Sequence, residues 1–180
     1  GSEPDLVACQ RAATYLERGA DRAAASFANP EAVGLYREAL ALLRELAGGE
    51  PTSGELALLL KLGSPLVATR SFADPEVAVI YDRARAISRA TGEHRAMFGA
   101  VRGLWQAAIG RSDYASGSEL ADELVALAAV VDDPGLELEA HRAVGNAVFW
   151  SGQFEKARKS MEYAVSVADV HPDAPLPQGF

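Results

Sequence analysis

Two pairs of polar residues recur 40 positions apart in this chain, and their side chains suit the recognition of a peptide. Arg102 and Gln106 are four residues apart, and so are Arg142 and Asn146. Residues at i and i+4 share one face of a helix, so each pair is expected to present a cation and an amide together. A guanidinium can bind a carboxylate through two hydrogen bonds, and an amide can bond a peptide backbone. These four positions are the predicted binding surface; the alternative is that the arginines are solvated or pair with acids such as Glu139.

Histidine and carboxylate spacings make a weaker case for a metal site. Glu137 and His141 are four residues apart, and Glu93 and His94 are adjacent. Helical metal sites use such spacing, but each of these motifs supplies only one histidine. We therefore expect no metal and no cofactor, and we expect His141 to pack in the core.

The residues that could support catalysis have simpler explanations. Asp132 and Asp133 precede Pro134, where an aspartate commonly caps a helix. Three serines flank a glycine-containing turn but lack the strand–turn–helix setting of a nucleophile elbow: Ser112, Ser116 and Ser118. We assign no catalytic residue and expect that the chain is not an enzyme.

Composition favours a helical, acidic protein. Apolar residues make up 49% of the chain and charged residues 23%, and Ala and Leu dominate. The formal net charge of −8 disfavours direct binding of nucleic acid, because phosphates need a positive surface. The single cysteine, Cys9, excludes an internal disulfide and predicts a reducing, cytoplasmic location. No segment approaches the roughly 20 apolar residues of a membrane helix, so no membrane partner is expected.

Residues typical of helix starts and ends divide the chain into eight predicted helices. Asn29-Pro30, Asp74-Pro75 and Asp133-Pro134 predict helix starts, because Asx side chains cap free N–H groups and Pro lacks one. Gly-containing segments at 48–51 and 91–92 predict helix ends. Pro65 is expected to kink or split the third helix. The helices are expected at about 5–26, 29–47, 52–69, 74–91, 93–110, 114–131, 134–151 and 153–170.

An internal repeat organises these helices. Residues 29–43 (NPEAVGLYREALALL) are similar to residues 74–88 (DPEVAVIYDRARAIS), and the pattern continues with a period of 40 through Tyr81, Ala121 and Met161. We expect one domain, 1–170, built from hairpins at about 5–47, 52–91, 93–131 and 134–170. The segment 171–180 contains three prolines and is expected to be a tail or linker.

The last hairpin resembles a tetratricopeptide unit. In HRAVGNAVFWSGQFEKA (141–157), Val144, Gly145 and Val148 occupy the Leu, Gly and aromatic positions of that motif, while His141 replaces its common Trp. The resemblance implies an all-α, right-handed superhelix of antiparallel hairpins with odd-numbered helices along its concave side. Some members of that family hold a peptide carboxylate there, which would give that role to Arg102, Gln106, Arg142 and Asn146.

Residues 10–170 also resemble the carboxy-terminal helical-repeat region of large bacterial signalling ATPases, including adenylate or guanylate cyclases and transcriptional regulators. The resemblance is carried by ATRSFADPEVAVIYDRARAI (68–87), RGLW (102–105) and HRAVGNAVFWSGQFEKARKSMEYAV (141–165). It implies a non-catalytic scaffold or sensor that binds a protein segment or the parent's own NTPase or cyclase domains. The chain has no phosphate-binding loop.

Three alternatives remain. The first is a small-molecule effector site near Arg102, Trp105 and Arg142, and the others, ranked lower, are an enzyme and a DNA-binding helical domain. Terminal hairpins of repeat arrays expose apolar faces, so a homodimer formed through the end hairpins is also expected.

Overall fold

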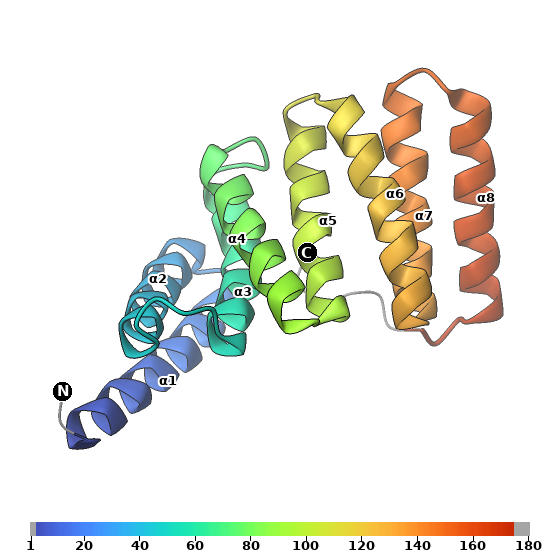
Figure 1. The fold of residues 1–180 in the computed structure, drawn as a ribbon. Coiled ribbons are helices and arrows are strands. Elements are labelled where there is room, and N and C mark those ends of the chain that lie inside the picture. The colour runs from blue at the N-terminus through green and yellow to red at the C-terminus, as the bar shows by residue number, and fades with distance from the viewer. Residues whose placement is uncertain (1–2, 175–180) are drawn as a thin grey trace.

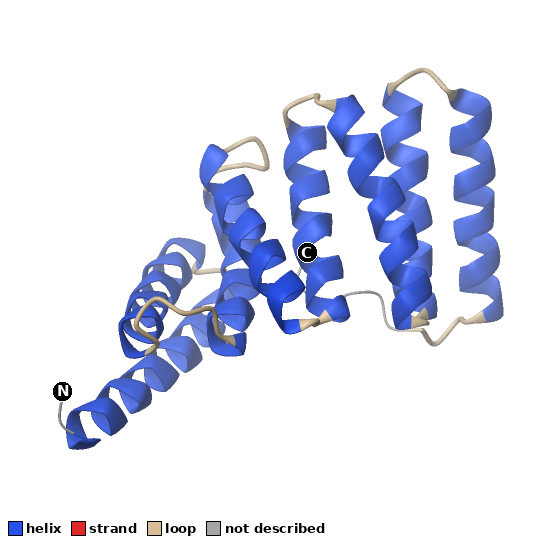
Figure 2. Cartoon of the chain, in the orientation of Figure 1, coloured by secondary structure: helices blue, strands red, loops and turns tan. Residues whose placement is uncertain are grey.

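The computed structural model describes residues 3–174, with side chains from Val7 onward, and contains eight helices and no strand in that part of the chain (Figures 1 and 2). The all-α class and the arrangement of stacked hairpins are confirmed. The helix ends differ from the expected ones by no more than two residues. The helices are α1 (Glu3–Ala25), α2 (Asn29–Leu46), α3 (Ser53–Thr69), α4 (Pro75–Thr91), α5 (His94–Gly110), α6 (Tyr114–Val131), α7 (Pro134–Trp150) and α8 (Phe154–Val170).

Successive helices pack against each other along the whole array, as expected for short connections. Further contacts join α3 to α5 and α5 to α7, so these odd-numbered helices share one side of the array. In Figure 1, α1 and α2 lie at one end and α8 lies at the other. None of the helices in the described part of the chain is long and apolar enough to cross a membrane.

Aspartate caps define two of the predicted helix starts. The Asp74 side chain accepts a hydrogen bond from the Glu76 amide at 2.8 Å, and Asp133 accepts from Gly135 at 2.8 Å. At the third predicted start, α2 begins at Asn29 as predicted, but the predicted cap is wrong. Asn29 is the first residue of α2 and makes no capping hydrogen bond, because the Ala28 carbonyl already accepts from the Ala32 amide at 3.0 Å.

The third helix is not split at Pro65. α3 runs from Ser53 to Thr69 without interruption, and the Thr69 hydroxyl donates to the Pro65 carbonyl at 3.0 Å. Leu62 and Leu66 of the same helix are almost completely buried. Tertiary packing therefore holds this helix together across the missing N–H. The predicted tail begins at His171, directly after α8, and residues 175–180 lie outside the described residues.

Two apolar clusters form the core. One joins α1–α4 with part of α5, and the other joins α5, α6 and α7 through residues such as Phe98, Trp105 and Val144. Tyr81 fills the space between α3, α4 and α5. A Cβ atom at Gly103 would lie 2.4 Å from three atoms of the Tyr81 ring. The glycine therefore lets α5 approach the tyrosine closely.

Candidate functional site

The structure brings the two predicted arginines together through Glu139 of α7. The Arg102 Nε atom, on α5, donates a hydrogen bond to Glu139. Arg142 donates to the same carboxylate from Nε at 2.7 Å and from Nη2 at 2.6 Å. Arg102 and Glu139 are only 7% and 5% exposed, whereas the Arg142 side chain is 38% exposed. The cluster therefore has one buried and one accessible cation.

Burial and ion pairing act in opposite directions on this cluster. Burial alone would raise the pKa of Glu139, but hydrogen bonds from Arg142 and the charge of Arg102 outweigh it and lower that pKa. The hydrogen bond to Glu139 raises the pKa of Arg142. Burial lowers the pKa of Arg102, but an arginine side chain stays protonated at neutral pH, so all three groups are charged and the cluster carries a net charge of +1.

Trp105 and Asn146 complete the surroundings of Arg142. The guanidinium carbon of Arg142 lies 5.4 Å from the centroid of the Trp105 ring, which is cation–π distance. Within the described part of the chain, the buried atoms Trp105 Nε1 and Asn146 Oδ1 have no hydrogen-bond partner. The ring and the carboxylate hold Arg142 in one orientation, and the Asn146 oxygen, four residues along α7, can accept a hydrogen bond.

From the sequence, Glu139 was predicted only as an alternative partner of the two arginines. Its spacing of three residues from Arg142 is a helical ion-pair signal, but its pairing with Arg102 depends on the packing of α5 against α7. Gln106 lies half-buried on α5, four residues from Arg102. The structure therefore joins the two arginines and places Asn146 beside one of them.

A second surface, a groove between α7 and α8, has an apolar lining. It has a volume of about 420 Å³ and includes Asn146, Phe149, Phe154 and Met161. The Phe149 and Phe154 rings meet edge to face at 5.4 Å and are 47% and 63% exposed. The spacing of these aromatics within the repeat predicts that they pack between hairpins, but both are exposed. They are exposed because α8 is the last helix of the described residues.

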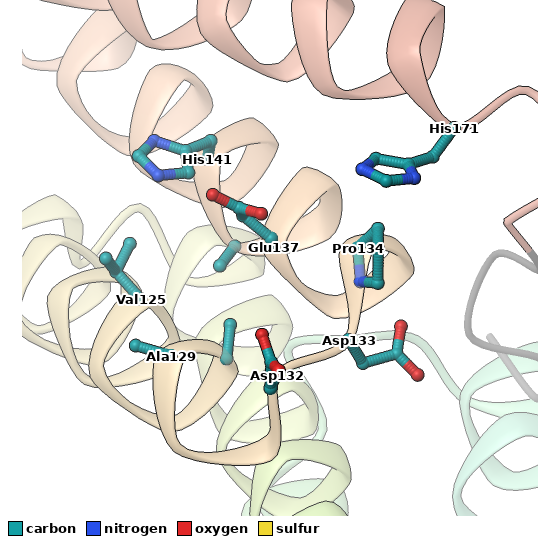
Figure 3. A pocket seen from close by; sticks show the side chains of 10 residues that line it. Val125, Ala129, Asp132, Asp133, Pro134, Glu137, His141 and His171 are labelled. Atoms are coloured by element: carbon teal, nitrogen blue, oxygen red, sulfur yellow. The ribbon is translucent and has the colours of Figure 1, made fainter.

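A third site is a pocket of about 540 Å³ between α6, α7 and the end of α8 (Figure 3). Its lining includes Asp132, Asp133, Glu137, His141 and His171. The Asp133 carboxylate already caps α7 and pairs with Arg95, and the Tyr163 hydroxyl donates to Glu137 at 2.6 Å.

His141 also has a packing role at this pocket. Its ring lies 4.3 Å from the ring of Tyr163 on α8, and burial lowers the pKa of its imidazole. In the described part of the chain, no group of three or more His, Cys, Asp or Glu side chains is arranged to hold a metal. The carboxylates of this pocket are therefore largely occupied by contacts within the chain.

No protein-family model matches the chain, and no curated protein sequence matches it. A solved structure described as the crystal structure of MamA protein is similar to it over 92% of this chain and 97% of that chain. The identity is 15% and the TM-score is 0.38. The arrangement of hairpins is therefore established from the helices of this chain itself.

Proposed function

We propose that this chain is a non-catalytic protein-interaction module that binds an extended segment of a protein along the shared face of α5 and α7. The observation that supports the proposal is the fixed and partly exposed position of the Arg142 guanidinium. Its guanidinium is held between the Trp105 ring and the Glu139 carboxylate and remains partly exposed. A cation fixed before binding loses little conformational freedom when a ligand arrives.

The chemistry of this face fits a segment with an acidic group. The net charge of +1 attracts a side-chain or terminal carboxylate, which Arg142 would bind. The half-buried Asn146 and Gln106 side chains would bond the segment further along α7 and α5. Arg102 is too buried to meet the segment directly, and its role is to position Glu139.

The setting of the module follows from its sequence resemblance to repeat regions of bacterial signalling ATPases. We place it in a cytoplasmic signalling or transcription-regulatory protein, with a separate protein or the parent's own NTPase or cyclase domains as partner. The resemblance over residues 10–170 supports this setting, and the net charge of −8 argues against direct contact with nucleic acid.

Selection of peptides tests the proposed function. A displayed library of random peptides is selected against the chain, and the enriched peptides are assayed by fluorescence anisotropy. We expect enriched peptides to carry Asp, Glu or a free terminal carboxylate, and to lose at least tenfold in affinity against Arg142→Glu. The control Arg89→Glu makes the same change of charge at an exposed site on α4. Equal binding to both variants, or no enrichment, would contradict the proposal.

A small-molecule effector is the second candidate. The buried Trp105 Nε1 atom is a donor with no acceptor among the described residues, and a ligand acceptor could satisfy it. The chain has two tryptophans, so Trp150→Phe leaves Trp105 as the single reporter. An effector at this position should change Trp105 fluorescence in a saturable way when carboxylate-containing metabolites are titrated. A flat titration across such a panel would count against it.

A further inference from the structure

We infer that the outer face of α7 and α8 binds an amphipathic helix of a partner protein that carries a carboxylate and, eleven residues later, an aromatic side chain. We call this surface the end face; its exposed members are Phe149, Phe154, Met161 and Val165. It goes beyond the proposed function because it recognises a helix rather than an extended segment, and its apolar residues are not used on the α5–α7 face.

The packing of α7 inside the array shows how a hairpin of this chain receives a helix. α7 packs against both α5 and α6. Near its start, Glu139 accepts a hydrogen bond from Arg102 of α5. At its end, Trp150 stacks on Tyr114 of α6 with ring centroids 6.2 Å apart and planes 13° from parallel. Glu139 and Trp150 are eleven residues apart, about three turns, and so lie on one face of α7.

The end face presents residues equivalent to those of α5 and α6 that contact α7. Forty residues after Arg102 and Tyr114 come Arg142 and Phe154. Arg142 uses Nε and Nη2 on Glu139, and no hydrogen bond joins its Nη1 to another described residue. Phe154 is 63% exposed. The end face therefore offers a cation and an aromatic ring in the register that α5 and α6 present to α7.

The apolar surface between Arg142 and Phe154 also consists of residues that are equivalent to residues forty positions earlier. Ala121 of α6 is 1% exposed in the core, whereas its equivalent forty residues later, Met161, is 36% exposed. Met161 covers Gly145, where an added Cβ would lie 2.9 Å from the methionine side chain. Because Met161 and Phe149 are larger than Ala121 and Ile109, the docking helix needs small residues. α7 itself provides the pattern with Ala140, Ala143 and Ala147, all buried.

A partner protein is favoured over a second copy of this chain by the sequence of its helices. Within α1 to α8, the only carboxylate followed eleven residues later by Phe, Tyr or Trp in the same helix is Glu139, with Trp150. Both of these residues already contact their own α5 and α6. No other helix among α1 to α8 carries the two anchors, so a second copy of these helices does not match the end face, and we assign the matching helix to a partner protein.

A peptide titration tests this inference. The probe is a fluorescein-labelled 17-residue peptide with the sequence of residues 134–150, and the second probe replaces its glutamate at 139 by lysine and its tryptophan at 150 by serine. We expect the intact chain to bind the first peptide saturably in the micromolar range, and the second at least tenfold more weakly. Phe154→Ser and Phe149→Ser should each weaken the first peptide by about tenfold. Val79→Ser, which removes an exposed apolar side chain from α4, should change nothing.

Three results would overturn the inference: no saturable binding, equal binding of the two peptides, or a dimer in sedimentation that dissociates on Phe154→Ser. The last result would assign the end face to a second copy. Circular dichroism checks that the variants remain folded. Phe154→Ser leaves Arg142 and Trp105 unchanged, so acidic peptides selected on the α5–α7 face should still bind it. Failure of the end face and failure of the proposed function are therefore separable.

Discussion

Replacing Glu139 by glutamine should destabilise the protein far more than replacing a surface glutamate. Glu139 is 5% exposed and accepts hydrogen bonds from both Arg102 and Arg142. Breaking a buried ion pair by removing one partner costs about 3–5 kcal/mol. Arg142 is partly exposed and can regain water, and the amide oxygen keeps one acceptor, so we expect a loss of about 3 kcal/mol.

Urea unfolding at pH 7 measures this loss, with Glu76→Gln as the matched control. Glu76 pairs with Arg37 at the surface, where the pair contributes about 0–1 kcal/mol. The double variant Arg102→Met with Glu139→Leu should recover part of the loss, because well-packed apolar residues can replace a buried pair at little cost. If Glu139→Gln loses no more than Glu76→Gln, the α5–α7 cluster does not hold Arg142 in place as argued.

The pH dependence gives an independent check on the same residue. The pKa of Glu139 is lower in the folded state than in the unfolded chain, so the unfolded state binds the proton more readily. Its contribution is complete above the unfolded pKa of about 4.3 and is lost as the pH falls through the folded pKa. The difference in unfolding free energy between the wild type and Glu139→Gln should therefore shrink as the pH is lowered below about 4. A constant difference would contradict the assignment.

Three further predictions concern packing, capping and a buried phenol. Gly103→Ala should cost about 1–3 kcal/mol in urea unfolding, because its Cβ would overlap the Tyr81 ring, whereas Gly34→Ala, with open space around it, should stabilise α2 by up to about 1 kcal/mol. Asp133→Ala should lower stability by about 1 kcal/mol through loss of a cap, but Asn29→Ala should have almost no effect; equal losses would contradict the observed start of α2. Burial raises the pKa of Tyr81 to about 12, so the stability gained by keeping this phenol neutral is complete below pH 10 and lost as the pH passes 12. Burial also raises the pKa of Tyr36, and the hydrogen bond to Glu137 raises that of Tyr163, so absorbance at alkaline pH should show several tyrosines titrating late. Tyr81→Phe should remove one tyrosine from that late group.

The helices could be predicted from the sequence because their signals are local. Asp74 and Asp133 act on amides two or three residues away, and Gly92 ends α4 with a positive φ of 72°. The cap predicted at Asn29 is missing for a local reason too, because Ala28, one residue earlier, is the N-cap of α2. Pro65 differs because the burial of Leu66, a tertiary effect, decides whether α3 continues. Helix propensity alone carries no information on such packing.

The candidate site could be predicted only in part, for a different reason. The spacing of Arg102 and Arg142 predicts that the two positions are equivalent in adjacent repeats. It could not indicate that Arg102 would be buried, because that follows from the contact of α5 with α7 and from Glu139, 37 residues along the chain. Two equivalent arginines thus have different surroundings: Arg102 is buried against Glu139, and Arg142 remains partly exposed.

The same asymmetry explains why equivalent residues of the repeat do not have equivalent surroundings. A repeat in the sequence predicts which side of each hairpin is apolar, but burial of that side requires a following hairpin. α7 packs over the helix of Ala121, whereas no described helix packs over Met161. Ala121 is therefore in the core, and Met161 is on the surface. If the end face did not bind a helix, polar residues in place of Phe154 and Phe149 would leave the affinity for the α7 peptide unchanged. If it is a binding surface, the same substitutions weaken that peptide by about tenfold while the helical content stays constant.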